Sequence, residues 1–569
     1  MPTVKEKLAA LLEDTLRSLP ETQVLDDLTL ADALVVEFPE HTEHGDLSSS
    51  LALRLARELK CKPRDLAQSV CDALDKSKHP LRPFISKCEV AGPGFVNFFL
   101  APAFFHEIIN EAHALGDDYG RSTVGGGKKV NIEFCSTNPT GPLTVAHGRQ
   151  VAVGDSLASL LSFAGYDATR EYYLNDCGNQ MTVLARSIYA RAAQSLGHDT
   201  PFPENGYQGE YITELGKKFA DKHGAKVLKS PEDQTIRAAQ VFGLKEMLKV
   251  IREDLKQFGV TYDVWFSEEE LRASGAVHRV IQDLEKKGLT VLKDDAIWLK
   301  TTDFGDDKDR VLVKSDGSMT YRTPDIAYHE SKFERGFELL IDLFGPDHHQ
   351  EAKEVAMALQ ALGHDADSIR VITVQFCTLY RGSERLKMST RAGQFITLRE
   401  LIEEVGKDAV RYFFTALKTN SHLNFDLELA KKHSLDNPVY YIQYVSARIA
   451  SVIRKAQEEL DLDSAAFKDG LYAPESIDLS PLEARDLQLA GWIARFGNII
   501  EGAAESLEVH RLCNFLRSFA EQFHNYYTHC RIIGDDPAMT NARLYLIGAA
   551  LVVLRNGLRI LGISAPDRM

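Results

Sequence analysis

The chain has 569 residues, of which 44% are hydrophobic and 26% charged, and its formal net charge is −16. This composition is typical of a soluble globular protein with three or four domains, and it excludes the collagen-like, disordered and small disulfide-rich classes. The acidic excess argues against a protein whose whole surface binds nucleic acid, although local basic faces remain compatible with it.

The sequence has no run of about 18 apolar residues and no signal-peptide apolar core at its N-terminus, so we expect a cytoplasmic protein that binds no membrane. Its eight cysteines are scattered and form no CxxC pair. We therefore expect reduced thiols, without a disulfide framework or a zinc site.

Residues 1–118 are predicted to form a small α+β module. The spacing of apolar residues indicates three helices and one strand, near residues 8–16, 51–59, 63–74 and 33–38. Alternation on both sides of Ala91–Gly94 then predicts a β-hairpin.

The stretch from 130 to 180 carries the densest pattern of the chain. Alternating apolar residues predict a strand over 130–134, and the turn residues CSTNPTGP follow as a loop. From Leu143 apolar residues recur at helical spacing up to Gly165, and a second strand is predicted over 169–174. Strand, loop, helix and strand form a βαβ unit, whose two strands are parallel.

In a βαβ unit the helix N-terminus faces the crevice where ligands bind, and its free N–H groups favour phosphate. Here that helix start carries Thr144, His147 and Arg149. The pattern alone leaves two interpretations open, a phosphate site or an ordinary helix start with a locally bonded histidine.

The remaining chain completes the predicted fold. Residues from about 181 to 290 are helical and highly charged, which predicts an insertion, and apolar runs at 339–344 and 369–376 predict buried parallel strands. Amphipathic helices with recurrent arginines fill 435–569. The predicted class is α/β: a doubly wound, Rossmann-like parallel sheet within 119–434, between an N-terminal α+β domain and a C-terminal all-α bundle.

Two motifs add a resemblance to a known family. The segment from Pro139 to His147 resembles the first signature of class I aminoacyl-tRNA synthetases, Pro-x-Gly-x-x-His-x-Gly-His, and Lys387–Arg391 (KMSTR) resembles the second, Lys-Met-Ser-Lys-Ser. The sequence around them, including EYYLNDCGNQ, DAVRYFF and the closing LGISAPDRM, is similar to bacterial arginyl-tRNA synthetases nearly from end to end.

The resemblance implies an enzyme that activates L-arginine with ATP and Mg²⁺ to arginyl-adenylate. It then transfers arginine to the 2′-OH of the terminal adenosine of tRNA(Arg). It implies a monomer that binds no DNA, without a protein-bound metal. The N-terminal domain then contacts tRNA through Phe95 and Asn97, and the helical domain binds the anticodon region, with Arg511 and Arg517 as candidates. The alternative for Phe95 is a core residue of the hairpin.

By the same resemblance, the catalytic candidates are His147, Thr144, Lys387 and Lys129. The positions that match the family's ATP site are Pro139, Gly141, Ala146, His147, Gly148, Gly345, Asp347, His348, Lys387, Met388 and Ser389. Three positions depart from the family pattern, because Thr144, Ala146 and Thr390 replace a His, a Gly and a Lys. The candidates for the charge that Thr390 lacks are Arg391, Arg385, Lys128 and Lys129, and the alternative is a low activity. We favour one of the two lysines before the first strand.

A pocket for arginine needs fixed carboxylates and acceptors, because a guanidinium is a planar fork of five donors that stays charged. The positions that match the family's arginine site are Glu133, Asn138, Tyr321 and Asp325. For Asp325, beside Pro324, a helix N-cap is the alternative. His348 and His349 are also possible metal ligands, but the sequence has no cysteine or carboxylate at ligand spacing on both sides of them.

Two other functions stay open. One is a nucleotidyltransferase of the same fold that adenylylates a small acceptor without tRNA. The other is an inactive tRNA-binding paralogue, suggested by the three departures from the signatures.

Overall fold

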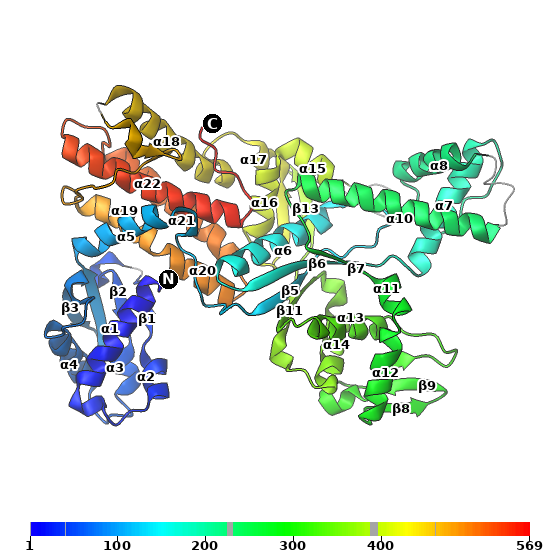
Figure 1. The fold of residues 1–569 in the computed structure, drawn as a ribbon, viewed down its shortest axis with the longest axis horizontal. Coiled ribbons are helices and arrows are strands. Elements are labelled where there is room, and N and C mark those ends of the chain that lie inside the picture. The colour runs from blue at the N-terminus through cyan, green and yellow to red at the C-terminus, as the bar shows by residue number, and fades with distance from the viewer. Residues whose placement is uncertain (1, 40, 225–231, 387–395, 461) are drawn as a thin grey trace.

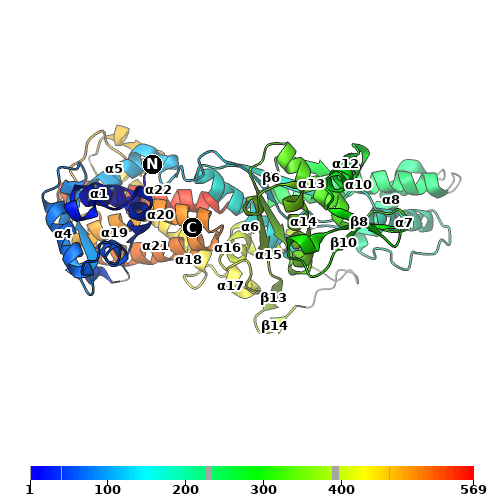
Figure 2. The same cartoon turned by 90° about the horizontal axis from the view of Figure 1, so that it is seen from below.

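The computed structural model describes residues 2–39, 41–224, 232–386, 396–460 and 462–569, except the side chains of residues 42 and 348–351. The molecule is elongated: an N-terminal module and a helix bundle form one end, a parallel sheet lies at the centre, and helices of an insertion extend to the other end (Figures 1 and 2).

The central sheet has five parallel strands in the order β12-β11-β5-β6-β7. Their bounds are β5 Lys129–Glu133, β6 Asp167–Leu174, β7 Val264–Ser267, β11 Leu339–Phe344 and β12 Ile369–Thr373. The chain starts at the middle strand, builds one half towards β7 and then the other half towards β12. The order of strands therefore reverses between β5 and β11, and ligands bind at such a point in doubly wound sheets.

Helices cover both faces of this sheet (Figure 1). Helix α6, Val145–Phe163, crosses over from β5 to β6 and is buried along most of its length. On the other face lie α13, Arg322–Glu334, and α14, His349–Leu362. The βαβ unit and the doubly wound class predicted from the sequence are confirmed.

The predicted insertion of 181–290 extends too far. Its helices α7 Asn179–Ser195, α8 Glu210–His223 and α10 Glu232–Gln257 pack around a separate apolar cluster. Strand β7 then returns to the central sheet, and the four residues VWFS are too few to show a period. After the insertion, three short strands form an antiparallel sheet: β8 Thr290–Lys293, β9 Ala296–Leu299 and β10 Arg310–Val313. Helices α11 Glu268–Ala273 and α12 Ala276–Lys286 precede it in the chain.

The N-terminal module is a four-stranded antiparallel sheet in the order β1-β2-β4-β3, with helices on one face. Its elements are α1 Val4–Ser18, α2 Asp27–Ala33, β1 Val36–Glu37, β2 Leu47–Ser49, α3 Leu51–Leu55, α4 Pro63–Asp75, β3 Ile85–Ala91 and β4 Phe95–Leu100. The predicted hairpin is confirmed as β3 and β4. The expectation of unpaired cysteines is wrong for Cys71 and Cys88, which form a disulfide between α4 and β3. Only the packing of this helix on the strand brings the two residues together.

The C-terminal part is the predicted bundle of α18 Pro438–Glu459, α19 Ala484–Ala494, α20 Phe496–Glu505, α21 His510–His529 and α22 Pro537–Ile560. Helix α5, Pro102–Leu115, packs against α19 and α22, where the His113 and Tyr545 rings stack 3.8 Å apart. By length and composition α22 qualifies as a membrane span, but 72% of its most apolar window is buried inside the protein. This helix is therefore the centre of the bundle.

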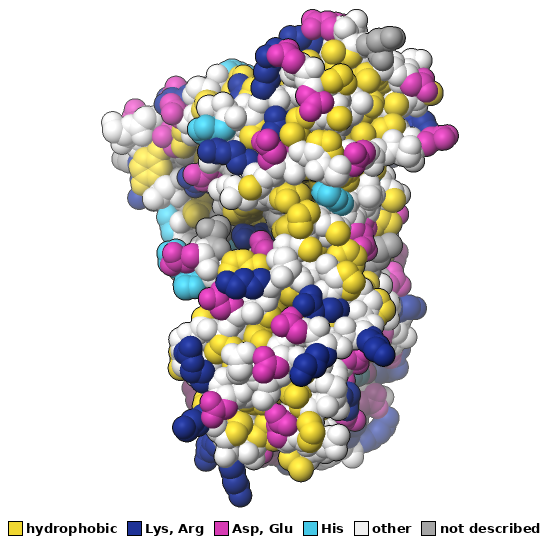
Figure 3. Space-filling model, turned by 90° about the vertical axis from the view of Figure 1, so that its left-hand side faces the viewer, with side chains coloured by type: hydrophobic (Ala, Val, Ile, Leu, Met, Phe, Trp, Pro, Cys, Tyr) yellow, Lys and Arg dark blue, Asp and Glu magenta, His cyan; other side chains and the backbone are white. Residues whose placement is uncertain are grey.

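Between sheet and bundle lie α15 Leu398–Val405, α16 Lys407–Thr415 and α17 Leu427–Lys431, with strands β13 Cys377–Arg381, β14 Glu384–Arg385 and β15 Leu423–Asp426. On the face of the bundle and N-terminal module seen in Figure 3, basic and acidic side chains are interspersed. That face shows no single large basic patch.

Candidate active site

A cleft of about 550 Å³ opens at the carboxyl ends of β5, β6 and β11, where the strand order reverses. It brings together six of the residues predicted from the sequence: Glu133, Asn138, His147, Tyr321, Asp325 and Gly345. A larger hollow of about 910 Å³ lies near α16 and α18 and is lined by none of the predicted site residues. The chemistry therefore belongs to the smaller cleft.

The N-terminus of α6 holds His147 as a neutral hydrogen-bond donor. Thr144 is the N-cap, and its backbone N–H donates to His147 Nδ1 at 3.1 Å. The proton of the ring is thereby assigned to Nε2, which lies 3.4 Å from the Thr137 hydroxyl. Burial lowers the pKa of His147 to about 4, so the ring stays uncharged near neutral pH.

The loop before α6 accepts hydrogen bonds from two tyrosine hydroxyls. Tyr172 donates to the Thr137 carbonyl at 3.0 Å, and Tyr211 of the inserted helix α8 donates to the Thr140 carbonyl at 2.8 Å. Cys135 has a φ of +70°, an unusual conformation for a residue with a side chain. Such local strain is typical of functional sites whose surroundings fix the backbone.

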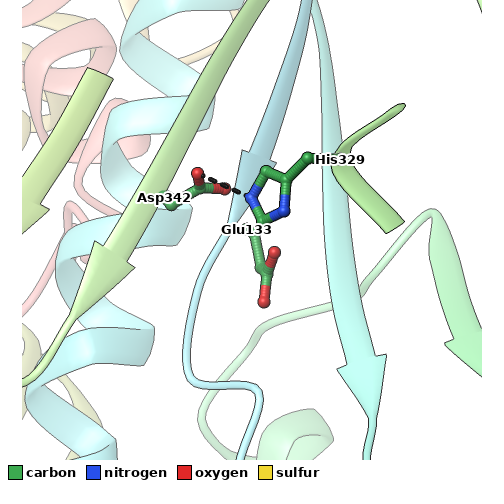
Figure 4. A group of neighbouring side chains, drawn as sticks. All are labelled: Glu133, His329 and Asp342. Carbon is green, nitrogen blue, oxygen red and sulfur yellow. Dashed lines mark hydrogen bonds and ion pairs between the residues drawn. The ribbon is translucent and has the colours of Figure 1, made fainter. Parts of the chain in front are cut away.

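Under the cleft lies a buried ion network that the sequence analysis did not foresee. The Lys332 ammonium, fully buried, lies 2.8 Å from Glu133 Oε2 and 2.9 Å from Asp342 Oδ1. His329 Nε2 lies 3.0 Å from Asp342 Oδ2 (Figure 4). Burial raises the pKa of Asp342, but the opposing effect of Lys332 and His329 is larger, so the pKa of this carboxyl is well below its usual range.

Glu133, His329 and Asp342 also place potential metal-ligand atoms within 4.8 Å of one another. Their geometry alone would allow a cation. However, the Lys332 ammonium already contacts both carboxylates, so the positive charge that such a group requires is built into the fold.

A second pair of charges extends this network. Arg335 bonds Glu171 through both terminal nitrogens, at 2.6 and 2.8 Å, and the Tyr328 hydroxyl donates to the same carboxylate at 2.7 Å. Three buried carboxylates thus face two cations, Lys332 and Arg335. Burial and Lys332 lower the pKa of His329, but Asp342 and Glu133 raise it above its ordinary value.

Asp325 lies in the first turn of α13 and lines the cleft, whereas the N-cap position belongs to Tyr321. The alternative reading of Asp325 as an N-cap is therefore wrong. Tyr321 itself is 81% exposed and forms part of the rim.

Three predictions at the start of the βαβ unit need correction. Lys129 begins β5, and its neighbour Lys128 precedes it, so both lie at the amino edge of the sheet while the cleft is at the carboxyl edge. The strand separates them by about 13 Å, at 3.3 Å per residue. Arg149 is 1% exposed and donates to three backbone carbonyls of residues 375, 418 and 421, so it anchors α6 instead of binding phosphate.

Several described residues that were predicted to bind ATP do not line the cleft. Pro139 is buried in the loop, Gly141 faces Tyr211, Ala146 is exposed, and a Cβ on Gly148 would meet Leu398 at 2.6 Å. Gly148 is thus required by the packing of α6 on α15. Asp347 is exposed just beyond β11.

Lys387, Met388 and Ser389 lie outside the described residues, as do Thr390 and Arg391 and the side chain of His348.

The predicted tRNA contacts lie far from the cleft in the other domains. Phe95 is 38% exposed on the open face of the N-terminal sheet, so its reading as a core residue is wrong. Asn97 on the same face is buried and accepts a bond from Ser48 at 2.9 Å. Arg511 and Arg517 are exposed on α21, and Arg511 pairs with Glu508 at 3.1 Å.

Sequence reasoning missed Lys332, His329 and Asp342. One signal was available, because Asp342 is the single charged residue within the apolar strand LLIDLF. A charge at such a position is costly unless a partner neutralises it, so it indicates a site.

Comparison with known proteins is consistent along the whole chain. Family models match residues 3–100 (arginyl tRNA synthetase N terminal domain), 113–421 (tRNA synthetases class I (R), catalytic domain) and 442–569 (DALR anticodon binding domain). The chain is 42% identical to the arginine–tRNA ligase of Syntrophotalea carbinolica over 569 residues, 100% of both chains. It is 45% identical to that of Moorella thermoacetica over 570 residues, 99% of both.

Solved structures show the same fold. The arginyl-tRNA synthetase of Thermus thermophilus superposes with a TM-score of 0.75 at 20% identity, and that of Plasmodium falciparum with 0.71 at 14%. Both matches cover all of this chain and all of the other.

Proposed function

The chain belongs to the arginyl-tRNA synthetase family of class I and is an arginine–tRNA ligase, and we propose that its reaction takes place in the cleft at the carboxyl edge of the five-stranded sheet. One observation carries this proposal: the same cleft contains a neutral histidine donor, His147, at a helix N-terminus and a pocket lined by carboxylates. A cationic amino acid and a phosphate chain need these two environments side by side.

In the first step the arginine carboxylate attacks the α-phosphate of ATP, and pyrophosphate leaves. This displacement needs positioning and positive charge more than a protein nucleophile. His147 Nε2–H is suited to donate to a phosphate oxygen, and Gly345 lines the cleft where β11 ends. Lys387, Met388 and Ser389 of the second signature are proposed to act on the departing phosphates, as the family resemblance implies.

Mg²⁺ is proposed to accompany ATP, held mainly by phosphate oxygens and water. In the described residues, the Lys332 ammonium already contacts both carboxylates of the Glu133–His329–Asp342 group, which disfavours a second cation there. The ion is therefore assigned to the nucleotide. Thr144 is proposed to act indirectly, because it holds the His147 ring by its backbone N–H.

Arginine is proposed to bind with its ammonium near Glu133 and Asn138 and its guanidinium near Asp325 and Tyr321. All four residues line the same cleft. One oxygen of Glu133 already contacts the Lys332 ammonium, so the charge of this carboxylate is partly neutralised. The remaining negative charge attracts one further cationic group, the ammonium of the substrate. A lysine side chain lacks the guanidinium fork and would leave acceptors unpaired, at a cost of about 1–3 kcal/mol for each group.

The tRNA is proposed to contact three parts of the chain: residues 1–118, the cleft within 119–434, and the bundle of 435–569. On the bundle, the Arg448 guanidinium lies between the Tyr444 and Tyr527 rings, 4.6 and 4.5 Å from their centroids. Exposed Phe95 offers a further ring. Aromatic and guanidinium planes of this kind stack on unpaired RNA bases.

In the second step the 2′-OH of the terminal adenosine of tRNA(Arg) attacks the carbonyl of arginyl-adenylate, an ester bond forms and AMP leaves. We propose that the enzyme acts as a cytoplasmic monomer; an equilibrium sedimentation mass near that of one chain, 63.5 kDa, is expected.

The test of the site is ATP–pyrophosphate exchange with purified protein, with and without arginine and tRNA. Exchange that requires arginine and is supported by tRNA is expected. Exchange without arginine would instead indicate a nucleotidyltransferase, and tRNA binding with no exchange would indicate an inactive paralogue.

A further inference from the structure

Tyr173, near the end of β6, has a buried hydroxyl without a hydrogen-bond partner among the described residues. The side chain lines the active-site cleft, and the residue is only 8% exposed. Buried polar groups are nearly always hydrogen-bonded, so an unpaired one in a ligand cleft indicates a partner that arrives with the ligand.

The neighbouring tyrosines make the contrast clear. Tyr172, Tyr211 and Tyr262 each donate to a backbone carbonyl at 2.8–3.0 Å, and Tyr328 donates to Glu171 at 2.7 Å. The fold thus satisfies the buried phenols around the cleft, with Tyr173 as the exception in the described chain.

The position of the Tyr173 ring is fixed. Its centroid lies 4.5 Å from that of Tyr328 and 6.2 Å from that of Phe266, and its backbone N–H donates to the Ser136 hydroxyl at 3.1 Å. The hydroxyl is therefore held in place before any ligand binds, which reduces the entropy lost on binding.

Three carboxylates act on this hydroxyl. Burial and then Glu268, Asp325 and Glu133 raise the pKa of Tyr173, so the phenol remains protonated. Glu268 begins α11 and also lines the cleft, and its Oε1 already accepts from Arg272 at 2.7 Å. Arg272, which pairs with Glu268, is the cation that lowers the pKa of Tyr173, whereas the Tyr173 hydroxyl has no hydrogen-bond partner among the described side chains.

A guanidinium brings five N–H donors, of which one carboxylate accepts at most two along one edge. The other donors need further acceptors in the same plane. A phenol can accept from a guanidinium N–H with its oxygen while its own O–H donates to a carboxylate. An ammonium group offers no planar second edge, so the same hydroxyl distinguishes the two cations.

We propose that the Tyr173 hydroxyl is a specificity-determining contact of this enzyme, which accepts a hydrogen bond from the guanidinium of arginine on the side facing Glu268. The inference rests on the proposed function of the cleft. It adds a contact from β6 to the pocket formed by Asp325 and Tyr321.

The test is Tyr173→Phe, with Tyr119→Phe as the matched control. The Tyr119 hydroxyl, in the turn after α5, donates to the Ile493 carbonyl of α19 at 3.2 Å, and neither residue lines the cleft. For Tyr173→Phe the KM for arginine should rise roughly tenfold to a hundredfold, with the KM for ATP unchanged. Its melting temperature should stay the same or rise, since no bond is lost in the free protein. The control should lose stability and keep both KM values.

A simple alkylguanidine, used as a competitive inhibitor, identifies the substrate group that is bound. If the hydroxyl binds the guanidinium, Tyr173→Phe weakens inhibition by butylguanidine by the same factor as it raises the KM for arginine. Weaker arginine binding with unchanged inhibition would overturn the assignment, and so would an unchanged KM for arginine or a fall in melting temperature with equal effects on both substrates. Absence of arginine-dependent exchange in the parent protein would instead overturn the proposed function.

Discussion

The buried ammonium of Lys332 provides a sharp test of the structure, through the substitution Lys332→Met. Methionine has a similar length and keeps most of the packing, but it leaves Glu133 and Asp342 without the cation that lies 2.8 and 2.9 Å away. The cluster then carries three carboxylates and one cation, Arg335. Removing one partner of a buried ion pair costs about 3–5 kcal/mol, because an uncompensated charge stays buried.

In a domain of this size each kcal/mol shifts the melting temperature by roughly 2–4 °C. We therefore expect the melting temperature of the catalytic domain to fall by roughly 6–20 °C. The assay is differential scanning calorimetry, since a chain of several domains does not unfold in one two-state step. Lys286→Met is the matched control, because its ammonium is 73% exposed and pairs with Asp283 at the surface. Such surface pairs are worth about 0–1 kcal/mol.

The deficit of Lys332→Met should also depend on pH. In the parent the folded pKa of Asp342 is depressed, so its contribution is present above the unfolded pKa of about 3.9 and is lost only as pH falls through the folded value. In the variant burial still raises that pKa and only His329 still lowers it, so the pKa of Asp342 lies above its value in the parent and the folded state takes up a proton at a higher pH. The difference between parent and variant should therefore shrink from pH 7.5 to pH 5.5. A deficit like that of Lys286→Met, or one that grows at lower pH, would refute the reasoning.

Four further outcomes are expected. Asp325→Asn should raise the KM for arginine roughly tenfold or more with the KM for ATP unchanged, as measured by pyrophosphate exchange; equal effects on both would contradict its guanidinium role. His147→Ala should slow adenylate formation roughly a hundredfold in rapid-quench experiments, and because burial lowers the pKa of His147 to about 4, the parent rate should show no titration of this ring between pH 6 and 8. Lys387→Ala should slow adenylate formation while tRNA binding, measured by filter retention, stays near normal; unchanged turnover would reject its role. Phe95→Ala should raise the KM for tRNA and leave that for arginine unchanged, whereas Leu28→Ala, at another exposed residue of the same module, should change neither.

Local patterns determined most of the architecture. Alternation and helical spacing predict β5, α6 and β6 correctly, because side-chain periodicity depends only on the element itself. The hairpin of β3 and β4 follows from turn residues in the same way. The strand β7 could not be predicted, because four residues are too few to show an alternating pattern. The predicted insertion is therefore longer than the observed one.

The error at Lys129 could have been avoided with the sequence alone. A residue that precedes a strand lies at the amino edge of a parallel sheet, whereas the ligand crevice lies at the carboxyl edge. The role of Arg149 was different: nothing near it in the sequence indicates that it binds carbonyls more than 200 residues away.

By itself, then, the sequence determined the elements, the direction of the strands and the motifs at the ends of β5 and β11. Only the tertiary structure decided which charges neutralise one another. Glu133 meets Lys332 across 199 residues, and Tyr173 lines the same cleft as Asp325 with no hydrogen-bond partner for its hydroxyl in the part of the chain that the structure describes. Such pairings depend on the packing of α13 against the sheet, and buried charges and hydroxyls depend on atoms a few ångströms away, which no local periodicity specifies.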